Sequence, residues 1–86
     1  MKKTLTINLN GMVFNIDEDA YHKLNNYLAE LGHHFPEAER EEIMNDIEAR
    51  IAELFNQKLQ HRNVVEIKDV EEVGETLGTP SQLDAA

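Results

Sequence analysis

The feature that most constrains the fold of this chain is a long stretch of helical periodicity between Glu37 and Leu59. Its apolar side chains recur three or four residues apart, which places them on one side of an α-helix. They are Ile43, Ile47, Ile51, Leu54 and Phe55. A helix of about 24 residues is roughly 36 Å long. We therefore expect the other elements of this short chain to be arranged so that they cover its apolar side.

Residues 4–16 predict a β-hairpin with a defined register. Asn10-Gly11 is the favoured dipeptide of a two-residue type I′ turn, in which both positions have φ > 0. Folding about this turn places apolar pairs on one face: Leu9 with Met12, Ile7 with Phe14, and Leu5 with Ile16. A slip of one residue would mix the polar and apolar faces, so the pattern specifies the register. Because an isolated hairpin is only marginally stable, we expect its apolar face to cover helices.

Local signals also delimit a first helix between the hairpin and the long helix. Asp17 is expected to be its N-cap, and the helix is expected to end near Leu31. Gly32 is expected in the left-handed conformation that commonly follows a helix. After a short connection, Pro36 suits the first position of the long second helix.

The region after the long helix predicts a short strand, residues 64–67, that adds to the hairpin. Val65 and Ile67 are expected to point inward. Asp69 and Glu72 then form a candidate capping pair for a third helix.

An apolar stripe on this third helix is formed by Val70, Val73 and Leu77, and Gly78 with Pro80 is expected to end it. Gly74 lies within the helix, where a glycine costs about 1 kcal/mol relative to alanine. It indicates either close helix packing or a weakened, mobile helix.

These elements predict an α+β fold of order ββααβα: an N-terminal β-hairpin, a two-helix hairpin, a short third strand and a C-terminal helix. The 86 residues suffice for one small core. We expect residues 1–83 to form a single domain and residues 84–86 to be a disordered tail.

The charge balance restricts the classes of partner. The chain has 17 acidic and 8 basic side chains, and its net charge is -9. Nucleic-acid binding depends on clustered lysine and arginine, so no direct nucleic-acid contact is expected. No apolar run approaches the roughly 20 residues that span a membrane. Any attachment to a membrane would therefore need segments absent from this chain.

The sequence offers little for catalysis, and we predict no enzyme, no catalytic residue, no cofactor and no metal. There is no cysteine, and the one serine, Ser81, lies near the end. His33 and His34 are adjacent in a loop and Glu37 follows, whereas metal sites usually need well-spaced ligands on rigid elements, such as i and i+4 on a helix. His22 has no histidine or cysteine partner at that spacing. Solvated loop histidines are the simpler interpretation.

The acidic side chains of the long helix allow two interpretations. They can form a solvated face, with Arg50 pairing with Asp46 at i, i+4. They can also form a docking surface, because a long face of one sign attracts a basic partner. On the second interpretation the candidate partner-binding residues are Glu41, Asp46, Glu48 and Arg50.

Three motifs carry a resemblance to a known family. They are the opening of the chain, residues 1–21 with Asn10-Gly11; the segment Asp46-Ile47-Glu48-Ala49-Arg50-Ile51-Ala52-Glu53-Leu54-Phe55; and Val70-Glu71-Glu72-Val73 followed by Leu77-Gly78-Thr79-Pro80. Together they resemble the N-terminal domain of phage-shock-protein-C-type (PspC) proteins of the Bacteroidetes. The acidic helix with the later Leu-Gly-x-Pro element is similar, more loosely, to the helical HAAS-type signalling domains.

The resemblance implies a non-enzymatic regulatory or protein-interaction domain of a membrane-anchored, phage-shock-like envelope-stress protein. It implies unidentified protein partners, with self-association among the contacts to consider, and a place at the cytoplasmic face of the inner membrane in the full-length protein. The alternative is a domain of a transcriptional regulator that contacts DNA through a partner. The family supplies no catalytic residues.

Overall fold

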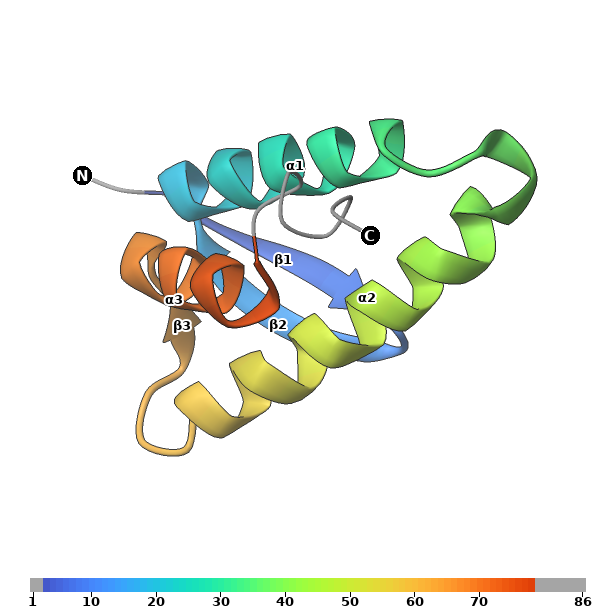
Figure 1. Ribbon diagram of the computed structural model, residues 1–86. Helices are drawn as coiled ribbons and strands as arrows, with labels where there is room; N and C mark the ends of the chain where they lie inside the picture. The colour runs from blue at the N-terminus through green and yellow to red at the C-terminus, as the bar shows by residue number, and fades with distance from the viewer. Residues whose placement is uncertain (1–2, 79–86) are drawn as a thin grey trace.

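The structure is a computed structural model that describes residues 3–78, and it confirms the α+β fold of order ββααβα (Figure 1). The strands are β1 (Thr4–Leu9), β2 (Met12–Asp17) and β3 (Val64–Val65). The helices are α1 (Glu18–His33), α2 (Glu37–Lys58) and α3 (Ile67–Leu77).

The β-hairpin has the register that the Asn10-Gly11 turn predicts. Leu9 pairs with Met12, Ile7 with Phe14 and Leu5 with Ile16. Asn10 and Gly11 have φ of 52° and 84°, as a type I′ turn requires. β3 extends the sheet in the order β1-β2-β3 and runs parallel to β2.

The helices lie on one side of the sheet, and α1 and α2 form a V (Figure 1). The two helices are close where the connection joins them and diverge toward the other end. There α3 lies in the space between them, and α1 contacts α3 more extensively than it contacts α2. The V therefore has an apex at the α1–α2 connection and a mouth that α3 fills.

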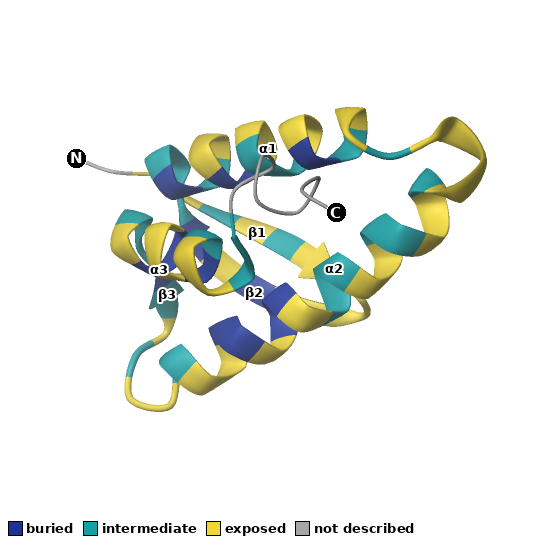
Figure 2. Ribbon diagram, viewed as in Figure 1, coloured by how far each residue is buried: buried dark blue, intermediate teal, exposed yellow. Residues whose placement is uncertain are grey.

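The core lies between the sheet and the helices, mainly toward the mouth of the V. It combines sheet residues such as Phe14 and Ile16 with Leu24 of α1, and the rings of Phe14 and Phe55 meet edge to face with centroids 5.7 Å apart. Figure 2 shows the buried residues of α2 gathered in its C-terminal part. They are Ile51, Ala52, Leu54 and Phe55. The predicted burial of Ile51 and Leu54 is confirmed, whereas Ile47 is only half-buried.

The end of α1 differs from the sequence-based expectation. The helix continues through Gly32 to His33, and Gly32 does not have positive φ. The reason is a side chain from the next helix. Arg40 donates from Nε to the carbonyl oxygen of Gly32 at 2.6 Å and from Nη2 to that of Phe35 at 3.1 Å. The first bond satisfies a carbonyl group in the last turn of α1, which the glycine-based end motif would otherwise help to satisfy, and the second fixes the connection to α2.

The starts of the first two helices match the expectation to within one residue. Asp17 lies at the N-cap of α1, but its side chain makes no capping hydrogen bond to the helix. Instead the carboxylate of Asp19 accepts from the N–H of Ala20 at 2.8 Å. Pro36 is the N-cap of α2, so the helix begins one residue later than predicted, at Glu37.

The boundary between β3 and α3 was predicted too late. The strand ends at Val65, which is buried as expected, and Ile67 is the first residue of α3. The capping box consists of Glu66 and Asp69, not of Asp69 and Glu72. Because Asp69 receives the N–H of Glu66 at 2.8 Å, the chain turns into the helix three residues before Asp69.

The end of α3 is fixed by Gly78, whose φ is 98°. The hydroxyl of Tyr27 in α1 donates to the carbonyl oxygen of Gly78 at 2.6 Å. A Cβ added at Gly74 would lie 3.9 Å from Cε1 of Tyr27, which is ordinary contact distance. Close packing of α3 on α1 therefore does not require the glycine at this position.

The predictions for the C-terminal end of the chain lie outside the described residues. They concern Pro80, the domain end at residue 83 and the tail of residues 84–86. Within residues 3–78, no helix has both the length and the apolar character needed to cross a membrane.

Candidate interaction surface

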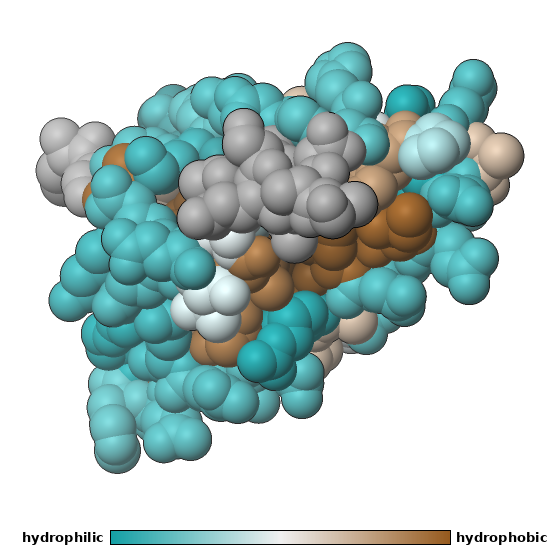
Figure 3. Space-filling view, viewed as in Figure 1, coloured by the Kyte–Doolittle hydropathy of each residue, from teal (hydrophilic) through white to brown (hydrophobic). Residues whose placement is uncertain are grey.

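The four residues predicted to bind a partner all lie on α2, toward the apex of the V. Glu41, Asp46 and Arg50 are exposed, and Glu48 is half-buried. Figure 3 shows a largely hydrophilic surface on the side it views, with apolar side chains visible between α1 and α2. In this half of α2, residues 37–50, no side chain is fully buried.

The four residues do not share one face of the helix. At 3.6 residues per turn, Glu41 and Glu48 are seven positions apart and lie on the same side. Asp46 and Arg50 lie on nearly the opposite side. A single flat partner cannot contact all four residues, so the structure divides the predicted surface into two candidate sides.

Arg50 makes a different ion pair from the predicted one. Its Nη1 lies 3.3 Å from Oε2 of Glu53, whereas the sequence predicted a pair with Asp46. On a helix, an arginine can reach the residue three positions ahead as well as the residue four positions behind, and here it takes the former. Both partners are at least half exposed, so the pair contributes little to stability.

A groove runs along the free edge of β1, and we call it the edge groove. Eight residues of three elements line it. They are Ile7, Asn8 and Leu9 of β1, Tyr21, Leu24, Asn25 and Leu28 of α1, and Glu48 of α2. Its volume is about 370 Å³. Tyr21, Leu24 and Leu28 are spaced by three and four residues, which places them in one stripe of α1. The carboxylate of Glu48 is the charged group among these eight residues, and Asn8 and Asn25 add polar side chains.

A second hollow lies at the apex of the V, and it shares two residues with the edge groove. Leu28 and Glu48 line both cavities. Here they are joined by Gly32, Arg40 and Met44. The guanidinium of Arg40 already donates hydrogen bonds to the carbonyl oxygens of Gly32 and Phe35, so it stabilises the connection between α1 and α2.

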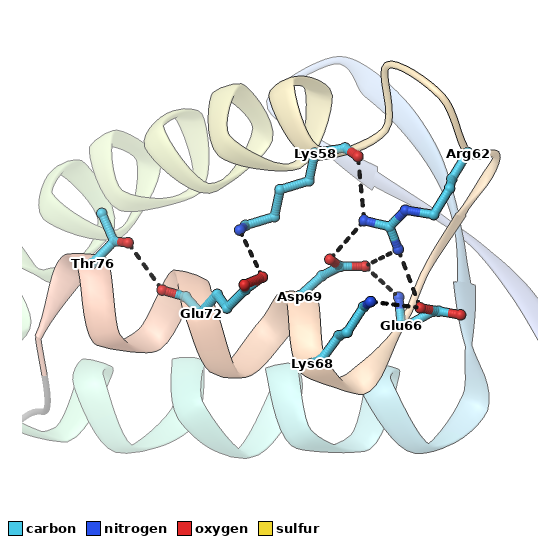
Figure 4. A network of polar contacts seen from close by, with 7 residues as sticks. All are labelled: Lys58, Arg62, Glu66, Lys68, Asp69, Glu72 and Thr76. Atoms are coloured by element: carbon cyan, nitrogen blue, oxygen red, sulfur yellow. Dashed lines mark hydrogen bonds and ion pairs between the residues drawn. The ribbon is translucent and has the colours of Figure 1, made fainter.

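A polar network joins α2 to the start of α3 at the opposite end of α2 (Figure 4). The guanidinium of Arg62 donates to both carboxylate oxygens of Asp69, each at 2.9 Å. It also donates to the carbonyl of Lys58 at 3.2 Å and to Glu66 at 3.2 Å. Asp69 is 1% exposed, and all of its contacts lie within the fold.

The environment of Asp69 keeps its carboxylate ionised. Burial by itself raises the pKa of a carboxyl group, because it disfavours the charged form. The hydrogen bonds from Arg62 and from the backbone at Glu66, together with the charges of Arg62 and Lys58, outweigh burial and hold the pKa of Asp69 below its ordinary value. A charge that is this well paired serves the structure, and it offers no free group to a ligand.

The histidines form no candidate metal site within the described residues. His22, His33, His34 and His61 are all exposed. Among residues 3–78, no group of three or more histidine and acidic side chains is arranged to hold a metal ion.

Sequence reasoning missed three features of this surface: the capping role of Arg40, the Arg62–Asp69 pair and the edge groove. The first two join residues eight and seven positions apart across a turn, and no periodic signal marks such pairs. The groove combines β1, α1 and α2, so only the packing of the three elements reveals it. The spacing of Tyr21, Leu24 and Leu28 was the one available hint.

Comparison with known proteins agrees with the looser of the two resemblances. The model of the HAAS family matches residues 22–86, which include α1 from its fifth residue onward and the whole of α2, β3 and α3. No match was found to a curated protein or to a solved structure. The β-hairpin lies outside the matched region, and the PspC resemblance is not addressed by these comparisons. Because the match covers well over half of its residues, this chain belongs to the HAAS family, a family of small regulatory or protein-interaction domains.

Proposed function

We propose that this domain is the non-enzymatic protein-interaction module of a membrane-anchored stress-response protein of the phage-shock-protein-C type. In this proposal it works at the cytoplasmic face of the inner membrane and transmits a signal by binding another protein. Membrane attachment would come from segments absent from this chain. Self-association is one form that the contact could take.

The observation that supports the proposal best is the difference in burial between the N-terminal and C-terminal parts of α2. Residues 37–50 include no buried side chain, although the helix continues without a break into the core. Acidic groups such as Glu41 and Asp46 project from this half. Exposed charges contribute little to folding, whereas complementary charges direct association and reject wrong partners.

Family membership supports the same direction. A HAAS domain is a regulatory or interaction domain, and the family is not known for catalysis. The buried carboxylate of the described residues, Asp69, is bound by Arg62 and the backbone, so it is not poised as a general acid or base. The phage-shock role rests on the sequence motifs alone.

The two candidate sides of α2 can be tested separately in the native host. One variant carries Glu41→Lys and Glu48→Lys, and a second carries Asp46→Lys. Glu75→Lys on α3, also exposed, is the matched charge-reversal control. Each protein is expressed in full length with its membrane segments and crosslinked in cells.

We expect one of the two α2 variants to lose a crosslinked partner that the wild type and the Glu75→Lys control both retain. The side that loses the partner is then the docking side. If all four proteins give identical partners, or none, the docking function of α2 is wrong. Tight, salt-dependent binding of the purified domain to a DNA duplex would instead favour the regulator that contacts DNA.

A further inference from the structure

Among residues 3–78, no strand pairs with the outer edge of β1. The hairpin register shows which backbone groups of β1 point toward this edge. In an antiparallel pair, alternate residues direct both their N–H and C=O groups toward the partner strand. The two residues that flank a two-residue turn form such a bonded pair. Here they are Leu9 and Met12, so Leu5, Ile7 and Leu9 bond to β2.

The remaining residues of β1, Thr4, Thr6 and Asn8, therefore direct their N–H and C=O groups away from β2. Two contacts support this assignment. The N–H of Glu18 donates to the C=O of Lys3 at 2.8 Å, so Lys3 bonds toward β2 in the same way as Leu5, Ile7 and Leu9. The side chains of Thr6 and Asn15 meet at 3.1 Å, as expected for a pair whose backbones do not bond to each other.

β1 lacks the features that usually protect a strand edge. Proteins block free edges with proline, inward charges, bulges or very short strands. β1 has six residues, TLTINL, without proline or charge, and its pairing with β2 is continuous. In contrast, the other edge strand, β3, has only two residues.

The edge groove lies beside this free edge. Its β1 wall includes Ile7 and Leu9, and Ile7 is only half-buried. Its α1 wall includes Tyr21 and Leu28, which are also half-buried. A strand added beside β1 would direct every second side chain to the helix side of the sheet, toward walls that combine these apolar side chains with Asn8 and Asn25.

From this arrangement we infer that the edge groove binds an extended segment of a protein partner, which adds to β1 as a fourth strand of the sheet. Main-chain hydrogen bonds to Thr4, Thr6 and Asn8 hold the segment, and apolar side chains at alternate positions fill the groove. A lysine or arginine of the segment meets Glu48 at the end of the groove, in agreement with the net charge of -9. The inference deepens the proposed function by naming a partner chemistry, and it rests on that function.

Hydrogen exchange of the free domain tests the edge first. The amides of Leu5 and Ile7 should be protected, and those of Thr6 and Asn8 should exchange rapidly, because nothing in the sheet accepts from them. Protection of Thr6 and Asn8 in the dilute domain would show that the edge is covered and would overturn the inference. Protection that vanishes on dilution would assign the edge to a second copy of the chain and also overturn it.

The ligand probe is a phage-displayed library of random peptides of about eight residues, long enough to match one strand. It is selected on the wild-type domain and counter-selected on Thr6→Pro. Proline removes one outward N–H, and edge strands tolerate it where the N–H faces solvent. Circular dichroism and the unfolding midpoint establish that the variant is folded. Should Thr6→Pro unfold the domain, Leu28→Glu, which places a charge on the α1 wall, replaces it.

We expect enriched peptides to alternate apolar and polar residues and to carry a basic residue. Binding should protect the amides of Thr6 and Asn8, and it should weaken about fivefold or more in Thr6→Pro. A peptide with an N-methyl group on its edge-facing amides should lose binding, while the same group on the other amides should not. Glu48→Lys should reverse the preference from a basic to an acidic peptide.

Three outcomes would exclude the inference. The selection could enrich no peptide, or the enriched peptides could shift amide resonances of residues outside the edge groove. The enriched peptides could also be helical and leave the amides of Thr6 and Asn8 unprotected. The result is separable from the test on α2. If crosslinked partners are retained by Thr6→Pro and lost on reversal of the α2 charges, the domain is an interaction module that does not use its strand edge.

Discussion

The N-terminal and C-terminal parts of α2 belong to one helix with one hydrophobic periodicity, yet only the C-terminal part has buried side chains. The C-terminal part, residues 51–58, contributes Ile51, Ala52, Leu54 and Phe55 to the core, whereas the longer N-terminal part, residues 37–50, contributes no buried side chain. The difference follows from what lies beside each half. α3 fills the mouth of the V next to the C-terminal part of α2, whereas no third helix of residues 3–78 lies at the apex (Figure 1).

The comparison teaches that periodicity identifies the side of a helix that can be buried, but not how far along the helix burial extends. That extent depends on the neighbouring element, which here comes from elsewhere in the chain. One half of α2 is thus constrained by folding, and the other half is available for contacts.

The largest expected effect is a difference between two matched isoleucine truncations. Ile51 is fully buried in the core, so Ile51→Ala should lower the free energy of unfolding by about 2–5 kcal/mol. Ile43 is half-buried and lies outside the core cluster, so Ile43→Ala should cost less than about 1 kcal/mol. Urea unfolding of both variants gives the comparison, and equal losses would show that the two halves of α2 are equally important for folding.

Asp69→Asn is expected to have the next largest effect, because it leaves Arg62 with only the more exposed Glu66 as a charged partner. We expect a loss of about 2 kcal/mol, less than for a fully buried pair because the Arg62 side chain is 35% exposed. Glu72→Gln breaks the more exposed pair with Lys58 and should cost about 0.5 kcal/mol or less. The same urea titrations measure both, and similar losses in the two variants would contradict the role given to Asp69.

Asp69 should also make the free energy of unfolding depend on pH. Its pKa is lowered in the folded state, so the unfolded chain takes up the proton first as the pH falls. The stabilisation is fully present above the ordinary aspartate pKa of about 3.9 and is lost as the pH falls through the folded-state pKa. Asp69→Asn should flatten this acid limb of the stability curve.

Gly11→Val tests how much the backbone conformation of the turn, and not side-chain burial, contributes to stability. Gly11 is exposed and a Cβ there would have no atom within 4 Å, but its φ is 84°. A β-branched residue should therefore destabilise the domain by roughly 1 kcal/mol or more through backbone strain alone. An unchanged thermal midpoint would contradict the type I′ turn.

The smallest effect is expected at the exposed acidic half of α2. Asp46→Lys should change the free energy of unfolding by no more than about 0.5 kcal/mol, because the carboxylate is exposed. Thermal unfolding of the purified domain measures this change. A loss above about 1 kcal/mol would mean that the apex half supports the fold through its charges.

Much of the fold could be predicted because its signals are local. The Asn10-Gly11 turn fixed the hairpin register, and the spacing of Ile51 and Leu54 located the inner side of α2. The end of α1 was predicted wrongly because a distant side chain replaced a local signal: Arg40 binds the carbonyl group of Gly32 from eight residues away. The start of α3 was predicted wrongly because two local capping pairs were possible, and the pair formed by Glu66 and Asp69 starts the helix before the predicted strand would end.

The candidate site was less predictable than the fold. The sequence marks Glu41 and Glu48 as acidic residues of an amphipathic helix, but it does not show that Glu48 is half-buried beside Leu28. It also does not show which strand forms the free edge, because that depends on β3 pairing with β2 and not with β1. Sites built from several elements depend on packing, which periodicity does not encode.

Residue-resolved hydrogen exchange of α2 tests the central contrast most directly. In the free domain, the amides of residues 51–55 should exchange only through global unfolding, while those of residues 41–46 should exchange through local opening at the apex, about tenfold faster or more. Uniform protection along the whole helix would contradict the account, because it would show that the apex half is held as firmly as the core half.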